Sequence, residues 1–192
     1  MGNREDLLAG ARTCLFEKGF ARTTVRDIAT ASGVSMAAIG YHFGSKEALL
    51  TAALTAATQE WGTELARALT ATDATEPDAL RRFAARWDTV RESITAHRGV
   101  WSATLDALSH TESREQLAAT TPEAQRGLAG LFEGMEDSDP EASRRVGTFY
   151  QALLIGVAAQ LLIDPETAPT GTDLAEALHR ITAPAGQTAT AG

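Results

Sequence analysis

The sequence is poor in cysteine, in aromatic residues and in long apolar runs. Its 192 residues include one cysteine, Cys14, which excludes an internal disulfide, and no cysteine and histidine spacing resembles a zinc site. The most apolar run, 148–163, contains two glutamines and is shorter than the roughly 20 residues that span a bilayer, so we interpret it as a buried helix. We therefore expect no metal, no cofactor and no insertion into a membrane.

Motifs of catalytic sites are also missing. The sequence has no phosphate loop, no nucleophile elbow and no His-Glu-x-x-His pattern, and its four histidines are scattered at positions 42, 97, 110 and 179. The first residues are polar and lack the apolar segment of a secretory signal. We expect no catalytic residues, a protein that is not an enzyme, and a cytoplasmic location.

Charge is distributed unevenly along the chain. The net charge is −8, yet residues 1–46 carry six basic and four acidic side chains, which leaves the remainder at −10. This asymmetry indicates a small nucleic-acid-facing end on an acidic body that phosphate repels. A DNA architectural protein would instead need a strongly basic surface.

Helical periodicity and helix stop signals recur throughout, which predicts an all-α protein. We expect a helix at about 4–18 and a short second helix that begins at 24. Further helices are expected at about 36–43, 45–69, 78–96, 99–110, 113–132, 140–163 and 172–182, with a break or kink at Pro122. We predict three parts: a three-helix domain at 1–46, a helical body at 47–183 joined to it by one continuous helix, and a disordered tail at 184–192. The acidic run 136–139 is interpreted as a solvated turn.

The second and third helices have the signals of a helix-turn-helix. Thr24 to Asp27 has the form of a capping box, Gly33 can adopt a positive φ in the connecting turn, and Ser35 can cap the next helix. Two short helices joined by such a turn allow the first to brace the second, whose N-terminal residues can then enter the major groove of DNA.

The runs TTVRDIATASGVS at 23–35 and IGYHFGSKEALL at 39–50 closely resemble the N-terminal DNA-binding region of the TetR/AcrR-like family of transcriptional regulators. The resemblance covers about residues 3–54. It implies an all-α fold, a homodimer that binds double-stranded DNA at an inverted-repeat operator, and a repressor released by a small molecule. An activator or a ligand-independent DNA-binding protein is the alternative.

Ten residues are predicted to bind DNA, the last eight of them by the resemblance: Thr24, Arg26, Ser35, Met36, Ala37, Ala38, Gly40, Tyr41, His42 and Lys46. Lys46 is interpreted as a phosphate contact or a surface charge, and His42 as a phosphate contact or a residue packed at the helix junction. Arg26 is interpreted as a guanine contact, a phosphate contact or a solvated surface arginine. Met36, Ala37 and Ala38 can pack against thymine methyl groups. Gly40 stands where the family typically has a phosphate-contacting tyrosine, which removes that contact.

Two further sets of residues are predicted in the body. A small apolar or amphipathic effector is expected among Phe83, Trp87, Trp101, Leu105, Leu128 and Phe132, which could equally fill a core. Apolar and small residues of the last two helices predict a dimer interface, with an intramolecular core as the alternative: Phe149, Ala152, Leu153, Gly156, Val157, Gln160, Leu174, Leu178 and Ile181.

Overall fold

The computed structural model describes residues 3–73, 76, 78–135 and 139–183, and within them it contains nine helices and no strand. The helices are α1 (Asn3–Lys18), α2 (Val25–Ser32), α3 (Met36–Phe43), α4 (Lys46–Asp73), α5 (Ala79–Ala96), α6 (Arg98–Ala107), α7 (Thr111–Glu133), α8 (Pro140–Ile163) and α9 (Gly171–Thr182). The predicted all-α fold is confirmed.

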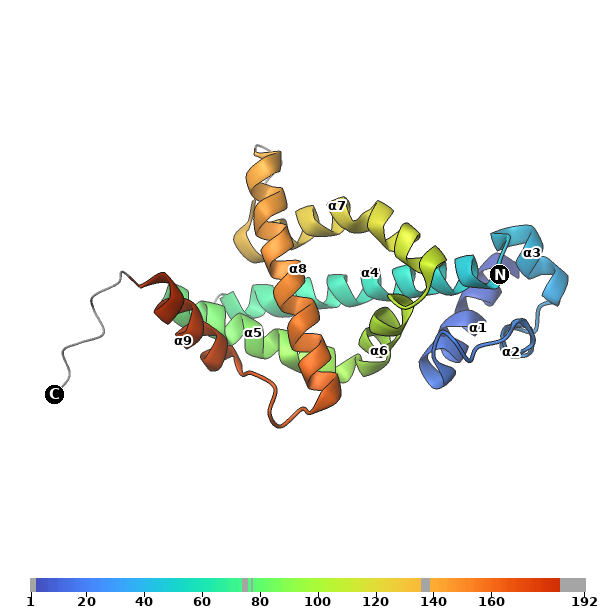
Figure 1. The fold of residues 1–192 in the computed structure, drawn as a ribbon, viewed down its shortest axis with the longest axis horizontal. Helices are drawn as coiled ribbons and strands as arrows, with labels where there is room; N and C mark the ends of the chain where they lie inside the picture. Colours follow the sequence, from blue (N-terminus) through green and yellow to red (C-terminus); the bar gives the residue numbers. More distant parts are fainter. Residues whose placement is uncertain (1–2, 74–75, 77, 136–138, 184–192) are drawn as a thin grey trace.

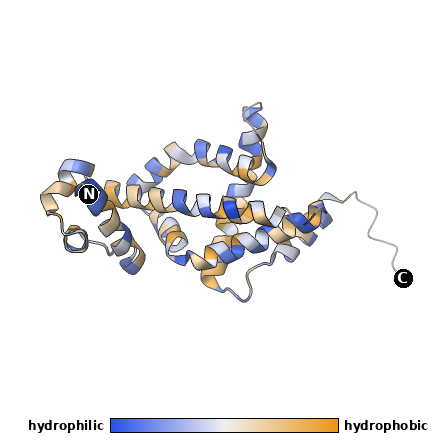
Figure 2. Ribbon diagram, turned by 180° about the vertical axis from the view of Figure 1, so that it is seen from behind, coloured by the Kyte–Doolittle hydropathy of each residue, from blue (hydrophilic) through white to orange (hydrophobic). Residues whose placement is uncertain are grey.

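The molecule is elongated, with α1, α2 and α3 at one end and α9 near the other (Figure 1). The long α4 runs from the three-helix end through the body, and α8 crosses it. Coloured by hydropathy, the helices carry both apolar and polar residues (Figure 2), as expected for amphipathic helices around shared cores.

Two hydrophobic cores lie along α4. The N-terminal core joins α1, α2, α3 and the first part of α4 to α6, through Val100, Ala103 and Ala107. The second, which we name the aromatic core, contains Trp61, Trp87, Trp101, Phe132 and Tyr150 together with aliphatic residues of α4, α5 and α8. Because α4 contributes to both cores, the three-helix domain and the body are packed together along one continuous helix.

The helix boundaries differ most from the predicted ones at α4, α6 and α7. α4 continues to Asp73, four residues beyond its expected end, α6 ends at Ala107, three residues before its expected end, and α7 begins at Thr111, two residues before its expected start. α7 is not broken at Pro122, which lies inside it at an exposed position. The helix is instead curved (Figure 1), since proline removes one intrahelical hydrogen bond without ending the helix. Positions 136–138 of the predicted turn and the predicted tail, 184–192, lie outside the described residues.

Two glycines set close helix approaches in the body. A Cβ at Gly147 of α8 would lie 1.9 Å from the Gln125 carbonyl oxygen of α7, and one at Gly171 of α9 would lie 1.9 Å from the Ala84 carbonyl oxygen of α5. Arg98, at the start of α6, donates hydrogen bonds to the carbonyls of Leu161 and Leu162 at the end of α8. These contacts fix α8, and with it α6, in the body.

Candidate DNA-binding site and its connection to the body

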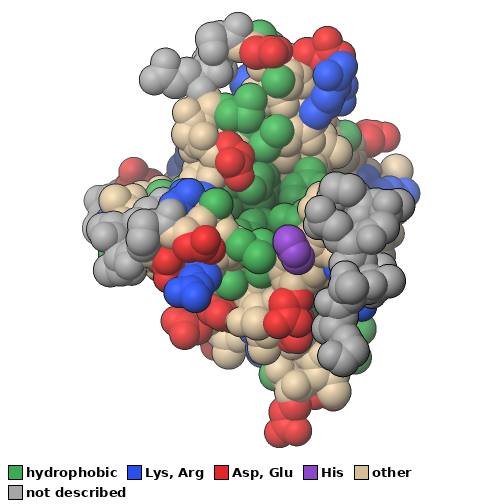
Figure 3. Space-filling view, turned by 90° about the vertical axis from the view of Figure 1, so that its left-hand side faces the viewer, with side chains coloured by type: hydrophobic (Ala, Val, Ile, Leu, Met, Phe, Trp, Pro, Cys, Tyr) green, Lys and Arg blue, Asp and Glu red, His purple; other side chains and the backbone are tan. Residues whose placement is uncertain are grey.

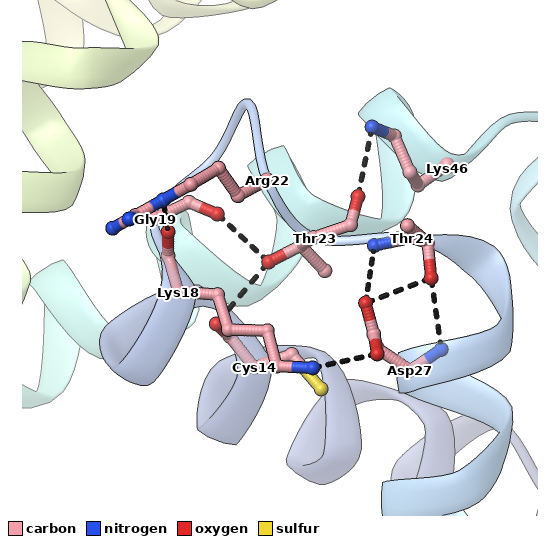
Figure 4. Close-up of polar contacts among 8 residues, drawn as sticks. All are labelled: Cys14, Lys18, Gly19, Arg22, Thr23, Thr24, Asp27 and Lys46. Atoms are coloured by element: carbon pink, nitrogen blue, oxygen red, sulfur yellow. Dashed lines mark hydrogen bonds and ion pairs between the residues drawn. The ribbon is translucent and has the colours of Figure 1, made fainter.

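The start of α2 is fixed by the predicted capping box. The Thr24 hydroxyl accepts a hydrogen bond from the Asp27 backbone N–H at 3.2 Å, and the Asp27 carboxylate accepts from the Thr24 backbone N–H at 2.9 Å (Figure 4). Lys18 of α1 donates to the same carboxylate at 2.6 Å. The bond from Lys18, followed by those from Thr24, lowers the pKa of Asp27 well below its usual range. Asp27 therefore ties α2 to α1.

The turn between α2 and α3 has the predicted glycine but not the predicted cap. Gly33 adopts the left-handed conformation with φ +69°, as expected. Ser35 occupies the N-cap position of α3, but its hydroxyl makes no capping hydrogen bond, so the expectation of a side-chain cap is wrong. The Ser35 hydroxyl and the first backbone N–H groups of α3 are therefore not joined by a capping hydrogen bond.

The Lys46 side chain makes contacts within its own chain. Its Nζ donates to the Thr23 carbonyl at 3.0 Å and lies 3.3 Å from a carboxylate oxygen of Glu47. Thr23 is buried, and its hydroxyl donates to the carbonyls of Gly19 and Cys14 (Figure 4). Lys46 consequently clamps the loop between α1 and α2 onto α4, a role that the sequence did not indicate. The phosphate contact predicted for it stays a prediction.

The other predicted DNA-binding residues lie together at the three-helix end of the molecule. Seven are exposed: Thr24, Arg26, Ser35, Met36, Ala37, Gly40 and Tyr41. Ala38 and His42 are half-buried, and the His42 ring meets the Tyr41 ring edge-on with centroids 4.9 Å apart. Arg4, which is outside the predicted set, lies with its guanidinium 5.2 Å from the centre of the Phe43 ring at the end of α3.

Contacts with α6 and α7 connect this domain and the first part of α4 to the rest of the body, and none of them had a signal in the sequence. The Phe20 backbone N–H donates to the Asp106 carboxylate of α6 at 2.8 Å, and the Phe20 ring stacks on His110 with centroids 4.7 Å apart. Ser45 donates to Glu112 at 2.9 Å, and the hydroxyls of Thr51 and Ser113 lie 3.2 Å apart. The ends of α6 and α7 thus hold the domain against the body.

The residues predicted to bind an effector are mostly packed in the aromatic core. Trp87, Trp101 and Phe132 are buried, whereas Phe83, Leu105 and Leu128 are half-buried. Trp87 stacks on Phe132, which stacks on Tyr150 with ring centroids 4.3 Å apart. Neither of the two pockets described, at the junctions of α1 with α6 and of α7 with α8, is lined by any of the six predicted residues.

Three indole N–H groups in the aromatic core have no hydrogen-bond partner within the described part of the chain. They belong to Trp61, Trp87 and Trp101, and the rings of Trp61 and Trp101 meet edge-on with centroids 4.8 Å apart. A buried polar group without a partner costs about 1–3 kcal/mol. The three unpaired donors lie in one cluster of the body.

Most residues of the predicted dimer interface form an outward face of α8 and α9. Phe149, Ala152, Gln160 and Ile181 are exposed, and Leu153, Gly156, Leu174 and Leu178 are half-buried. Three residues of the set contribute to the core of their own chain instead: Val157 is buried in the aromatic core, and Leu153 and Leu174 pack against it. The end of the molecule that carries α9 shows apolar side chains gathered in a hollow, with charged side chains around it (Figure 3).

A capped short helix, a glycine turn and an exposed second helix, all held against the start of a long helix, define a helix-turn-helix domain on a helical body. A family model described as bacterial regulatory proteins, tetR family, matches residues 7–53. Residues 7–53 are therefore similar to the DNA-binding domain of the tetR family of regulators.

The similarity to known proteins is strongest in this domain. The HTH-type transcriptional repressor AcnR of Corynebacterium efficiens is 44% identical over 52 residues, which cover 27% of this chain and 28% of AcnR. The match therefore spans little more than a quarter of that relative. The body is related to known structures by fold alone.

Two solved structures of the multidrug binding protein EbrR have this fold. The complex with imidazole matches with a TM-score of 0.68 and 24% identity, over 95% of this chain and 91% of EbrR. The complex with proflavin matches with a TM-score of 0.62 and 20% identity, over 94% of this chain and 99% of EbrR.

Proposed function

We propose that this protein is a cytoplasmic transcriptional repressor that binds an inverted-repeat operator as a homodimer and is released by a small molecule. The observation that carries the proposal is the α2–α3 unit, whose exposed face is held by Asp27, Thr24 and Lys46 at the end of the chain that has net positive charge. The family match over residues 7–53 and the named repressor AcnR support it.

Homodimerisation is supported by the outward face of α8 and α9. Ile163 and Ile181 are 83% and 80% exposed, and Phe149 is 49% exposed. Large apolar side chains that are this exposed favour association, since burial removes about 25 cal/mol of unfavourable free energy for each Å² of apolar surface. Gly156 lies among them, and a Cβ there would meet no atom of the chain within 4 Å, so a partner helix has room to approach.

α8 is long and apolar enough to cross a membrane by length and composition, which offers a second explanation of this face. Its opposite side is packed against α7 and contributes Tyr150, Leu154 and Leu161 to the aromatic core. Because one side of α8 already packs in a protein core, we infer that a second copy of the chain, and not lipid, covers its exposed side. Sedimentation with and without detergent distinguishes the two outcomes.

The proposed effector is a flat, largely apolar molecule with hydrogen-bond acceptors, bound beside Trp61, Trp87 and Trp101. The unpaired indole N–H groups support this choice, as does the similarity in fold to EbrR, which was solved with proflavin. Trp101 lies five residues before Asp106 on α6, so displacement of Trp101 shifts the residue that holds the Phe20 backbone. Coupling of about 1–3 kcal/mol between the two sites corresponds to roughly 5-fold to 150-fold in DNA affinity.

Selection of binding sites from random DNA, followed by footprinting, tests the proposal. We expect an inverted repeat whose half-sites lie about 34–36 Å apart or a multiple of this spacing, because two-fold protein symmetry requires two-fold operator symmetry. A promoter fusion to a reporter gene should be repressed by the protein. An asymmetric single site, or activation of the reporter, contradicts the proposal.

A further inference from the structure

The outward face of α3 consists of four residues without charge. Met36, Ala37, Gly40 and Tyr41 are exposed, whereas Ile39 is buried in the N-terminal core. Their spacing of one, three and four residues places them on the same side of a helix. In a complex with DNA, these are the side chains that α3 presents to the edges of the bases.

The surrounding sequence offers very few polar groups for contacts with bases. Residues 24–45 contain one arginine, one aspartate and one histidine, and no asparagine, glutamine or lysine. Adenine is recognised by asparagine or glutamine, guanine by arginine or lysine, and cytosine by aspartate or glutamate. Asp27 is occupied by Lys18 and by the capping box, which leaves Arg26 of α2 as the guanine contact available in this segment.

Several basic side chains outside this segment are held by contacts within the chain. Arg12 pairs with Glu60 and lies over the Phe16 ring, Lys18 pairs with Asp27, and Lys46 donates to the Thr23 carbonyl. These three side chains therefore contribute to the stability of the domain. On the outward face of α3 and at its N-cap, the groups left for contacts with bases are the methyl groups of Met36 and Ala37 and the hydroxyls of Ser35 and Tyr41.

Gly40 keeps the outward face of α3 flat. A Cβ at this position would meet no atom of the chain within 4 Å, so the glycine is not required by packing inside the protein. Its outward neighbours one helical turn earlier, Met36 and Ala37, end in methyl groups, and Tyr41 is exposed beside it. A flat apolar surface of this kind can approach the floor of the major groove closely, where the exposed apolar group of DNA is the C5-methyl of thymine.

We propose that α3 recognises thymine through its methyl group, with Met36 and Ala37 packed against thymines in each operator half-site. The inference rests on the proposed DNA binding and names the base that this helix selects. Arg26, on the bracing helix α2, contributes the polar contact beside it.

Replacement of thymine by deoxyuridine tests this directly, because the exchange removes only the methyl and keeps every hydrogen-bonding group. The probe is the operator duplex obtained by selection from random DNA, labelled with fluorescein, with one thymine replaced at a time. Burial of one methyl group corresponds to about fourfold in affinity. We expect a loss of about fourfold in fluorescence anisotropy titrations at one or two positions of each half-site.

Variants of the protein assign the effect to α3. With Met36→Ala, the loss caused by uracil at one of these positions should shrink to less than twofold. Met135→Ala, the same change two residues beyond the end of α7, should leave the uracil effect unchanged and is the matched control. Circular dichroism establishes that both variants are folded.

The possible results separate this inference from the proposed function. If no DNA is selected, the proposed function fails. If DNA is bound but every thymine tolerates uracil within twofold, or the half-site contains no thymine, the inference is overturned while the DNA-binding function stands. If uracil weakens binding equally for wild type and Met36→Ala, thymine is selected by another part of the protein and the role of Met36 is overturned.

Discussion

The helix-turn-helix domain and the aromatic core of the body are stabilised in different ways. In the domain, Thr23, Thr24, Asp27 and Lys46 are all hydrogen-bonded to neighbouring groups, several of them to the backbone. In the aromatic core, stacked rings fill the space and three indole N–H groups are left without partners among the described residues. Directional bonds fix one geometry in the helix-turn-helix domain, whereas packing of the rings leaves three buried donors without a partner in the described part of the chain.

Trp101→Ala tests the aromatic core with the largest expected effect. The ring is buried against Trp61, so truncation should lower the free energy of unfolding by about 3–5 kcal/mol. Urea denaturation measures the loss, and Ser102→Ala, an exposed neighbour on α6, is the control and should change stability by less than about 0.5 kcal/mol. A stable Trp101→Ala protein that no longer responds to effector would mean that Trp101 lines a pocket and contributes little to the core.

Gly147→Ala should also destabilise the body, by about 3 kcal/mol, because the added methyl would overlap the Gln125 carbonyl and force α7 and α8 apart. Gly127→Ala on α7 is the matched control, since a Cβ there meets no atom within 4 Å. It should stabilise the protein by up to about 1 kcal/mol, the difference in helix propensity. Thermal unfolding of both variants gives the comparison, and equal melting temperatures would contradict the close approach.

Local signals carried most of what the sequence could predict. The capping box at Thr24, the left-handed Gly33 and the exposure of the α3 residues follow from neighbours in the chain, and the structure has all three. Contacts between distant residues left no local signal. The hydrogen bonds from Lys46 to Thr23 and from Phe20 to Asp106 depend on how the helices pack. The burial of Val157 in the aromatic core depends on helix packing in the same way.

Arg26 and Lys46 should respond differently to substitution by alanine. Arg26 is exposed, so Arg26→Ala should leave folding unchanged, relax base preference at one position and weaken binding by about 1–3 kcal/mol if it contacts guanine. Lys46→Ala removes the bond to the Thr23 carbonyl, so the domain should lose about 1 kcal/mol of stability. Affinity of Lys46→Ala for all DNA sequences should fall alike. Site selection and thermal melting with each variant measure these effects, and identical base preferences for wild type and Arg26→Ala would limit Arg26 to phosphate contact.

Gly40→Ala separates folding from DNA contact in the outward face of α3. Because the added methyl meets no protein atom, the free protein should gain up to about 1 kcal/mol from helix propensity. If α3 lies close to the groove floor, the same methyl should weaken DNA binding severalfold. Stability is measured by thermal melting and affinity by anisotropy, and an increase in both would show that α3 does not approach the DNA at this position.

The smallest effect is expected from a comparison of the two capping boxes, one in each region. Thr24 and Asp27 begin α2, and Thr170 and Asp173 begin α9 with the same reciprocal bonds. The pKa of each aspartate is lowered: by Lys18 first and then Thr24 for Asp27, and by Thr170 for Asp173. The boxes differ mainly in the lysine, which is present only at Asp27.

A carboxylate whose pKa is lower in the folded state stabilises the fold above its ordinary pKa of 3.8, and this contribution is lost as the pH falls below that value. The stability difference between wild type and Asp27→Asn should therefore be full at pH 6 and shrink towards pH 2. Asp173→Asn should follow the same course with a smaller amplitude, because Asp173 has no lysine partner. The excess at Asp27 should weaken in 1 M salt, where an ion pair near the surface is screened. Melting temperatures at several pH values measure both variants, and equal amplitudes that do not respond to salt would mean that Lys18 adds nothing to the capping box of the DNA-binding domain.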